Sequence, residues 1–209
     1  MTRQLLWPDL EPKAIEEGWI ADPFPSLSAA QVLDALSLRH SMAGWNGMPG
    51  RWVFAREVSA QTGLWGDQQR FDAVAIGLTP AVKYARVVYE VKVSRSDWQG
   101  ELRGRFDVKR RYTGENDADG MPNYVREKVR RPGNKWDAAL AVSTEFYIAA
   151  PPKVVQLSEL PPEAGLVEIR PWGKDGELRA RVVKAAPVRD TPNPGPEFWA
   201  SMLRKAAAR

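Results

Sequence analysis

The chain has 209 residues, no cysteine, a single histidine and a formal net charge of +4. Without a thiol there is no cysteine nucleophile, disulfide or thiolate metal site, and His40 alone cannot complete the Cys or His set of a structural zinc site. Any catalysis is expected to rest on Asp, Glu, Lys, Arg or a hard cation bound through oxygen. The lack of a long apolar run and the proline and acid near the N-terminus predict a cytoplasmic protein without a membrane span.

The first half of the chain is predicted to form an N-terminal arm, a helix and three strands. Four prolines interrupt residues 1–25, which are predicted to be an N-terminal arm packed on the body. Apolar residues at helical spacing predict a helix that begins at Ser26 or Ser28 and ends at about 42. His40 is expected on a face of this helix rather than as a metal ligand. Aromatic and β-branched runs predict strands at 52–58, 71–78 and 86–93. Ser94 with Asp97, or Ser96 with Gln99, has the spacing of a capping box, so a second helix is expected after the third strand.

The second half contains a basic excursion and the rest of the domain. Residues 104–134 are polar and interrupted by glycine and proline, and a short helix is predicted at 123–130. The stretch 95–135 holds eleven basic and seven acidic residues, so it accounts for the whole positive surplus. A helix at 136–142, a strand at 146–150 and a hairpin of 165–170 with 178–183 complete an α/β domain at 26–184. Residues 185–209 are predicted to form a proline-rich linker and a helix at 197–208.

The candidate chemistry lies on two of the predicted strands. Side chains alternate along a strand, so Glu90 and Lys92 share one face, and pairing with the 71–78 strand brings Asp72 beside Glu90. Two carboxylates and a backbone carbonyl, that of Val91, suit Mg²⁺. Lys92 would orient or deprotonate a water, or balance the charge of a phosphorane. The alternative is that Glu90 and Lys92 lie on a solvated edge strand and that Asp72 ends a turn.

This array resembles the PD-(D/E)XK nuclease superfamily, in which the residues lie on a strand–turn–strand unit followed by a helix and another strand. The segments 52–58, 70–78 and 89–98, with 146–151 and 160–166, are similar to MmcB-like DNA-repair nucleases of phages and bacteria. The most specific stretch runs from Glu90 to Asp97. The resemblance implies a restriction-endonuclease-like core, with a mixed central β-sheet flanked by helices, that cleaves DNA with Mg²⁺ or Mn²⁺.

The resemblance also implies roles for individual residues. Asp72 and Glu90 would be metal ligands together with the Val91 carbonyl, and Lys92 would be the catalytic lysine. Glu57 would be an additional ligand or a water-positioning acid.

Three features depart from the family pattern. Phe71 stands where the signature proline precedes the first carboxylate. The Gln-Xaa-Xaa-Xaa-Tyr helix motif of the RecB-like branch is absent after Lys92. The excursion at 104–134 is long for this type of protein, so the substrate geometry is expected to be its own.

Basic residues after the site predict contacts with nucleic acid phosphates. They are Arg95, Lys109, Arg110, Arg111, Arg126, Lys128, Arg130 and Arg131. Their alternative interpretation is a solvated loop diluted by nearby acids. The expected partner is DNA; RNA and a homodimer stay open. Two other functions stay open beside the nuclease: a non-catalytic nucleic-acid-binding module on a nuclease-like fold, and a protein-interaction factor.

Overall fold

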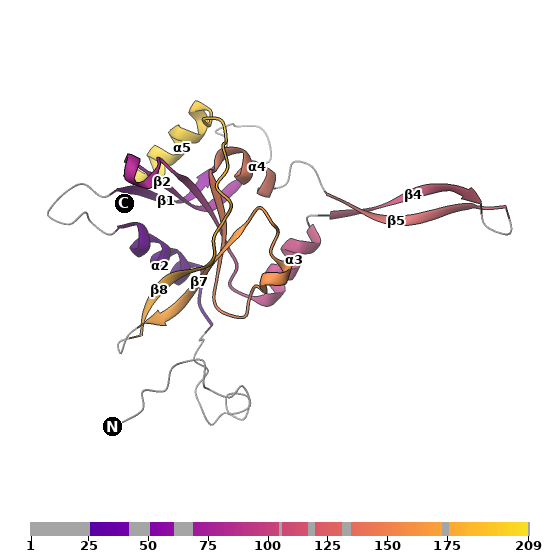
Figure 1. Ribbon diagram of the computed structural model, residues 1–209. Helices are drawn as coiled ribbons and strands as arrows, with labels where there is room; N and C mark the ends of the chain where they lie inside the picture. The colour runs from indigo at the N-terminus through magenta and orange to yellow at the C-terminus, as the bar shows by residue number, and fades with distance from the viewer. Residues whose placement is uncertain are drawn as a thin grey trace, which may run out of the picture.

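Figure 1 presents a computed structural model of the chain, which describes residues 26–41, 51–60, 69–104, 106–116, 120–130, 135–172 and 176–208. Its centre is a six-stranded sheet in the order β1-β2-β3-β6-β7-β8. The strands are β1 (Trp52–Ser59), β2 (Arg70–Gly77), β3 (Arg86–Val91), β6 (Glu145–Ala150), β7 (Gly165–Trp172) and β8 (Glu177–Lys184). The predicted N-terminal arm lies outside the described residues.

The sheet is mixed. β1, β2 and β3 are antiparallel neighbours, with a short 3-10 turn, η3 (Pro80–Val82), between β2 and β3. β6 and β7 continue the sheet parallel to β3, and β8 returns antiparallel to β7. The predicted α/β class, with a mixed central sheet flanked by helices, is therefore confirmed, and so is the hairpin of β7 and β8.

Helices cover both faces of the sheet, which explains why β2 and β3 are apolar almost throughout. On one face, α2 (Ala29–Ser41) packs Val32 and Leu36 against Tyr89 and its neighbours in a buried cluster. On the other face, a second cluster takes Trp98 from α3 (Arg95–Gly104) and Trp136 from α4 (Lys135–Val142). It also includes residues of α5 (Pro196–Ala207). We call this second layer the α3/α4 face.

Local hydrogen bonds place the starts of two helices at the serines that the sequence marks. The amide of Gln31 donates to Ser28 Oγ over 3.3 Å, and the amide of Ser28 donates to Gln31 Oε1 over 2.9 Å, which is the reciprocal pattern of a capping box. The amide of Asp97 donates to Ser94 Oγ over 3.2 Å at the start of α3. These caps fix the helix that follows β3.

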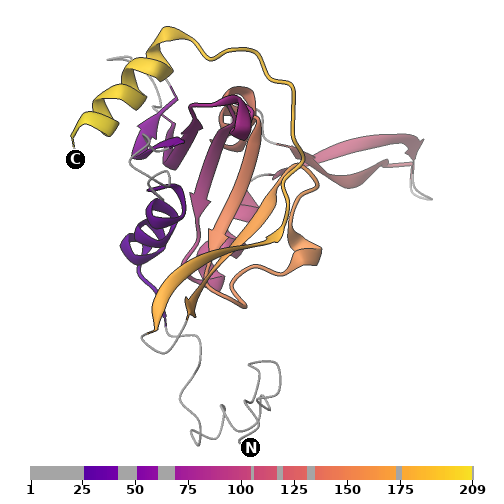
Figure 2. The same cartoon turned by 60° about the vertical axis from the view of Figure 1, so that its left-hand side comes forward.

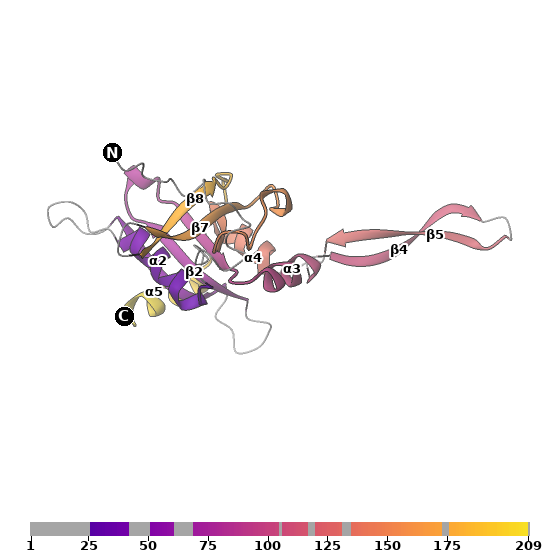
Figure 3. The same cartoon turned by 90° about the horizontal axis from the view of Figure 1, so that it is seen from below.

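The basic excursion is a two-stranded antiparallel hairpin rather than a loop with a helix. β4 (Phe106–Asn116) and β5 (Pro122–Arg130) form their own sheet, which extends away from the body beyond α3 in two views (Figures 1 and 3). We call this hairpin the arm. The helix predicted at 123–130 is wrong because Tyr124, Val125 and Val129, residues that favour strands, pair with β4.

The C-terminal segment returns the chain to the first strand. Residues 185–195 connect β8 to α5 without helix or strand, and α5 lies beside β1 (Figure 2). Phe198 and Met202 are buried there, and the amide of Ser59 donates to Ser201 Oγ over 3.0 Å. The predicted helix at 197–208 is confirmed. Among the described helices, none combines the length and the apolar character that crossing a membrane requires.

Candidate active site

The site begins where β2 and β3 separate. Their pairing runs from Ile76 opposite Arg86 to Ala73 opposite Tyr89 and ends there. Beyond this point the Val91 amide donates its hydrogen bond to a side chain, Asp72 Oδ2, over 2.7 Å. Asp72 therefore accepts from a backbone amide that has no partner in the β2–β3 pairing, and its second oxygen, Oδ1, is directed to other partners.

Glu90 and Lys92 lie side by side at the end of β3. They alternate with Val91 and are buried, with 4% and 6% of their surface exposed. Lys92 Nζ lies 3.0 Å from Glu90 Oε1. The backbone amide of Lys92 donates to the Ala149 carbonyl of β6 over 3.0 Å, so the lysine is anchored to a central strand. The structure thus brings together the acid and the base that strand periodicity places on one face.

A second lysine, Lys135, joins the two carboxylates. It is the first residue of α4, and its Nζ lies 3.2 Å from Asp72 Oδ1 and 2.5 Å from Glu90 Oε2. One ammonium group therefore stands between the two acids that the sequence pairs. Lys135 was not predicted as a site residue, because nothing in its own neighbourhood relates it to β2 or β3.

Helix α3 contributes two further acids to Lys92. Its Nζ lies 3.1 Å from Glu101 Oε2 and 3.6 Å from Asp97 Oδ1. The indole of Trp136 donates to Glu101 Oε1 over 2.7 Å and so holds that carboxylate in place. Glu101 was not predicted either, although a signal existed: Asp97 and Glu101 are four residues apart on the helix that directly follows Lys92, and so share one helix face.

Burial and the neighbouring opposite charges act against each other on the pKa values of Glu90 and Lys92. Burial, with the neighbouring Asp72 carboxylate, raises the pKa of Glu90 to about 6, although Lys135 and Lys92 oppose the rise. Burial acts to lower the pKa of Lys92, but Glu90, Glu101 and Asp97 outweigh it and hold that pKa above its usual range. In this arrangement Lys92 is a cation at neutral pH, so it is suited to stabilising negative charge rather than to removing a proton from water.

The donor set of the site fits one hard cation. Among the described residues, no three Asp, Glu or His side chains gather as a metal cluster. Asp72 and Glu90 do converge on a single positive group, the Lys135 ammonium, which serves as a stand-in for a cation. Mg²⁺ is commonly bound by one or two carboxylates, and water molecules fill the rest of its coordination sphere, so the pair of Asp72 and Glu90 suits this ion. Val91, the predicted carbonyl ligand, is the last residue of β3, directly beside both acids.

Glu57 lies on β1 opposite Asp72, between the register pairs of Arg56 with Ala73 and of Val58 with Phe71. The backbone at this residue has a positive φ of 55°. Its carboxylate lies 3.7 Å from Arg70 NH1 and 3.7 Å from Lys205 Nζ of α5. The Glu57 carboxylate therefore faces two basic side chains, and its role as an additional ligand or water-positioning acid stays a prediction.

The predicted phosphate-binding residues fall in two places. The Arg95 guanidinium forms a two-pronged pair with the Glu159 carboxylate of η4 (Leu157–Glu159), which also accepts from the Trp98 indole over 3.0 Å. The hydrogen bonds from Arg95 hold the pKa of Glu159 at about 2. The others belong to the arm: Lys109, Arg110 and Arg111 on β4, and Arg126, Lys128 and Arg130 on β5. Arg131 lies outside the described residues.

The backbone register of the arm pairs basic residues of its two strands. Arg110 of β4 is the direct cross-strand partner of Arg126 of β5. Arg111 is exposed, and so are Tyr112 and Tyr124, whose rings lie 5.9 Å apart further along the arm.

The single histidine belongs to the opposite layer. His40 is buried on α2, where its Nε2 forms a 2.8 Å hydrogen bond with the Tyr89 hydroxyl. Its ring also packs against Trp52 and Phe54. Burial, followed by the charge of Arg39, lowers the pKa of His40 to about 4, so the ring is neutral at physiological pH. This is a core histidine, as its helical position indicates.

Comparisons of this chain with protein-family models, with curated proteins and with solved structures returned no match. The functional assignment therefore depends on the geometry of Asp72, Glu90, Lys92 and Lys135.

Proposed function

We propose that this protein is a metal-dependent nuclease that hydrolyses phosphodiester bonds of DNA. The observation that carries the proposal is the convergence of the Asp72 and Glu90 carboxylates on one cationic position, with buried Lys92 against Glu90. Buried charges of this density are costly to a fold and cluster at functional sites. The likeness of the array to the PD-(D/E)XK pattern supports the same reaction.

Each residue has a role in this proposal. Asp72 and Glu90 would hold Mg²⁺ or Mn²⁺, with the Val91 carbonyl beside them. The ion, when bound, would supply a Lewis acid for the scissile phosphate and lower the pKa of a water ligand. Lys92, kept protonated by Glu90 and Glu101, stabilises negative charge that develops on the phosphoryl oxygens.

Lys135 acts as an exchangeable counter-ion. Without a divalent ion, its ammonium neutralises both carboxylates and makes the burial of Glu90 tolerable. The side chain of Lys135 is about a quarter exposed, so with a divalent ion held by Asp72 and Glu90 it could turn toward solvent and would be available to a substrate phosphate. The arm supplies further phosphate contacts through its basic residues.

The test is cleavage of supercoiled plasmid and of single-stranded DNA in Mg²⁺ or Mn²⁺. We expect nicking or degradation by the wild-type protein, its loss in EDTA, and a loss of at least a hundredfold in Asp72→Asn and in Lys92→Met. Arg204→Ala, an exposed residue of α5, is the control that should keep full activity. Activity that survives both Asp72→Asn and Lys92→Met would show that the site lies elsewhere.

One observation favours a second function, a nucleic-acid-binding module without cleavage. The Lys135 ammonium already occupies the position between the two carboxylates. In that case DNA binding would be salt-sensitive and unchanged by EDTA, and no DNA would be cut in either metal. Lys135→Ala separates the two functions: a nuclease binds Mn²⁺ more tightly without the competing lysine, whereas a binding module takes up no metal.

A further inference from the structure

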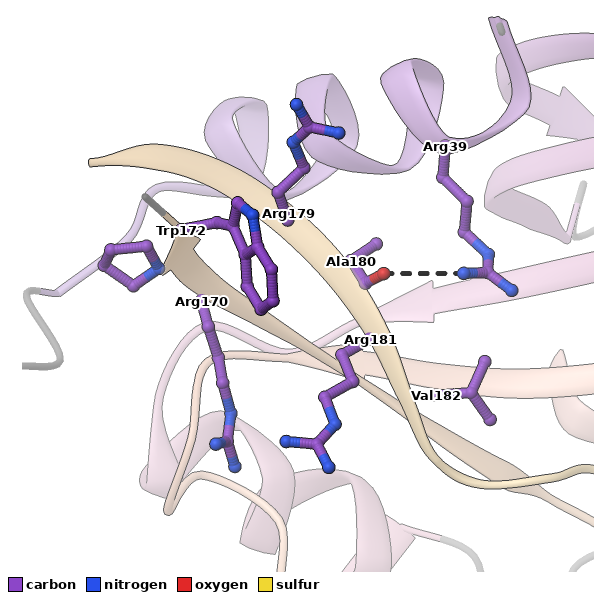
Figure 4. Close-up of a pocket in the computed structure, with 8 residues that line it drawn as sticks. Arg39, Arg170, Trp172, Arg179, Ala180, Arg181 and Val182 are labelled. Atoms are coloured by element: carbon purple, nitrogen blue, oxygen red, sulfur yellow. Dashed lines mark hydrogen bonds between the residues drawn. The ribbon is translucent and has the colours of Figure 1, made fainter. Parts of the chain in front are cut away.

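The far end of the β7–β8 hairpin carries a basic hollow that the candidate active site does not use. Four arginines and a tryptophan line it, in a volume of about 820 Å³. They are Arg39, Arg170, Trp172, Arg179 and Arg181, and we call them the Arg–Trp surface. Figure 4 shows the side chains of Arg170 and Arg181 extending in the same direction from neighbouring strands, while Arg39 reaches the Ala180 carbonyl from α2.

Strand register places most of this surface on one side of the sheet. Arg170 is the cross-strand partner of Arg179, and Trp172 is the partner of Glu177. On β8 the alternate residues, Ala180 among them, pack toward the α2 layer. Arg170, Trp172 and Arg181 therefore lie on the α3/α4 face, the same face of the sheet as Glu90 and Lys92. Arg179 instead extends toward α2 (Figure 4), where it lines a second hollow with Arg39.

The charges of the Arg–Trp surface are only partly balanced. Arg170 pairs with Glu168, and Arg179 pairs with Glu177 at 2.6 Å. Within the part of the chain that the structure describes, neither Arg39 nor Arg181 forms an ion pair, although Glu168, the partner of Arg170, is also the cross-strand neighbour of Arg181. Among the described residues of this hollow, four arginines thus share two carboxylates, those of Glu168 and Glu177, and an excess of positive charge in a hollow attracts an anion.

Trp172 is the second component of the surface. Its side chain is 67% exposed, although an indole is among the side chains that gain most from burial. An exposed large aromatic ring among arginines indicates a partner that has both a flat apolar face and negative charge. A nucleobase attached to a phosphate combines these two properties, because the base stacks on the ring while guanidinium groups bind the phosphate.

We propose that the Arg–Trp surface binds a single-stranded segment of nucleic acid, with a base stacked on Trp172 and phosphates on the arginines. The inference deepens the proposed nuclease function and rests on it for the choice of a strand over other anions. The strand register relates the two sites. β7 lies two strands from β3, and Val91 of β3 is aligned, through Ala149 of β6, with Val167 of β7. Trp172 lies five residues beyond Val167. The separation is about 20 Å, the axial rise of about six nucleotides.

The consequence concerns the substrate. A strand held at both places runs from the Asp72 and Glu90 carboxylates along the α3/α4 face to the end of β7. Oligonucleotides shorter than about six residues cannot reach both sites, so they are expected to bind much more weakly than longer ones.

The experiment measures binding of fluorescein-labelled oligothymidylates of 4, 8 and 16 residues by anisotropy, in EDTA so that cleavage plays no part. We expect Trp172→Ala to weaken binding of the 16-mer about tenfold or more. Arg181→Ala is expected to reduce the slope of log affinity against log salt by about one, and Arg181→Lys to restore it. Leu203→Ala, an equally exposed apolar residue of α5, and Arg204→Ala are the matched controls and should change neither quantity.

Three results would overturn the inference. The first is unchanged affinity in Trp172→Ala with circular dichroism showing an intact fold. The second is thymidine monophosphate binding as tightly as the 16-mer, which would make the ligand a free nucleotide. The third is polyglutamate displacing the 16-mer at comparable concentration, which would indicate an acidic protein partner. Plasmid cleavage by the same variants is recorded separately, so a failed nuclease function and a failed Arg–Trp surface give different results.

Discussion

The side chain of Asp72 performs two tasks with its two oxygens. Oδ2 accepts from the Val91 amide, and Oδ1 faces the Lys135 ammonium. An asparagine can keep the first contact and loses the negative charge. We therefore expect both Asp72→Asn and Asp72→Ala to abolish cleavage, whereas Asp72→Ala lowers the free energy of unfolding by about 1 kcal/mol more, because the Val91 amide then has no acceptor. Urea unfolding of the two variants measures the difference, and equal stability would refute this role of Oδ2.

Glu90 makes stability depend on pH in a predictable direction. Its folded-state pKa of about 6 lies above the usual 4.5, so between these values the folded protein holds a proton that the unfolded chain has lost. The free energy of unfolding therefore falls as pH rises from 4.5 through 6, by up to about 2 kcal/mol. Glu90→Gln should lack this fall. The measurement is urea unfolding of both proteins in EDTA at pH 4.5, 5.5 and 7; parallel curves for the two proteins would exclude a raised pKa at Glu90.

At the scale of single elements, α5 stabilises the edge strand β1 through a narrow apolar face. Met202 is buried and its neighbour Leu203 is 67% exposed. We expect Met202→Ala to lower the free energy of unfolding by about 2–5 kcal/mol, because it leaves a cavity against the core, and Leu203→Ala to change it by less than about 0.5 kcal/mol. Thermal or urea unfolding distinguishes the pair. Equal effects would mean that α5 does not pack as described.

The arm is an element whose removal should spare the body. Two-stranded hairpins are marginally stable alone, and the arm adjoins the body at α3. Replacing residues 106–130 by a short Gly-Ser linker is expected to leave the melting temperature nearly unchanged. DNA affinity should fall, and the salt slope should shrink by about one for each phosphate that the arm neutralises in the wild-type protein. A melting temperature lowered by more than about 10 °C would contradict a peripheral arm.

An element could be predicted when its own residues decide its conformation, and not when residues elsewhere in the fold decide it. β3 follows from its own residues, since Val87, Val88 and Tyr89 favour a buried strand and the period of two pairs Glu90 with Lys92. Residues 123–130 have only a weak local pattern, and pairing with β4 decides their conformation against the predicted helix. Cross-strand partners of this kind are set by tertiary structure, which local propensity does not contain.

At the scale of the whole molecule, the site forms where distant segments meet. Asp72 and Glu90 could be paired from the expected antiparallel strands. Lys135 could not, because it reaches the site from the start of α4 only after the arm has left and returned to the body. The family resemblance places Glu57 with the acids; the register puts it opposite Asp72, and its carboxylate lies near Arg70 and Lys205. Sequence patterns thus identify the residues of one strand well and the convergence of four elements poorly.

The arrangement of the sheet also explains why the site lies at this end. β3 and β6 are parallel, and in sheets of this kind ligands bind beyond the carboxyl ends of the strands. Glu90, Val91 and Lys92 occupy that end of β3, and α3 and α4 close over it. The Arg–Trp surface continues the same face at the end of β7. A substrate that follows this face would contact both, with the arm to one side.

The most direct test of a metal-dependent site is a crystal structure of the protein soaked in Mn²⁺, with anomalous scattering measured at a wavelength sensitive to manganese. We predict one strong anomalous peak at bonding distance from carboxylate oxygens of both Asp72 and Glu90, with the Lys135 ammonium displaced from between them. The absence of a peak, with Lys135 still bridging the two carboxylates, would contradict a metal-dependent active site at this position.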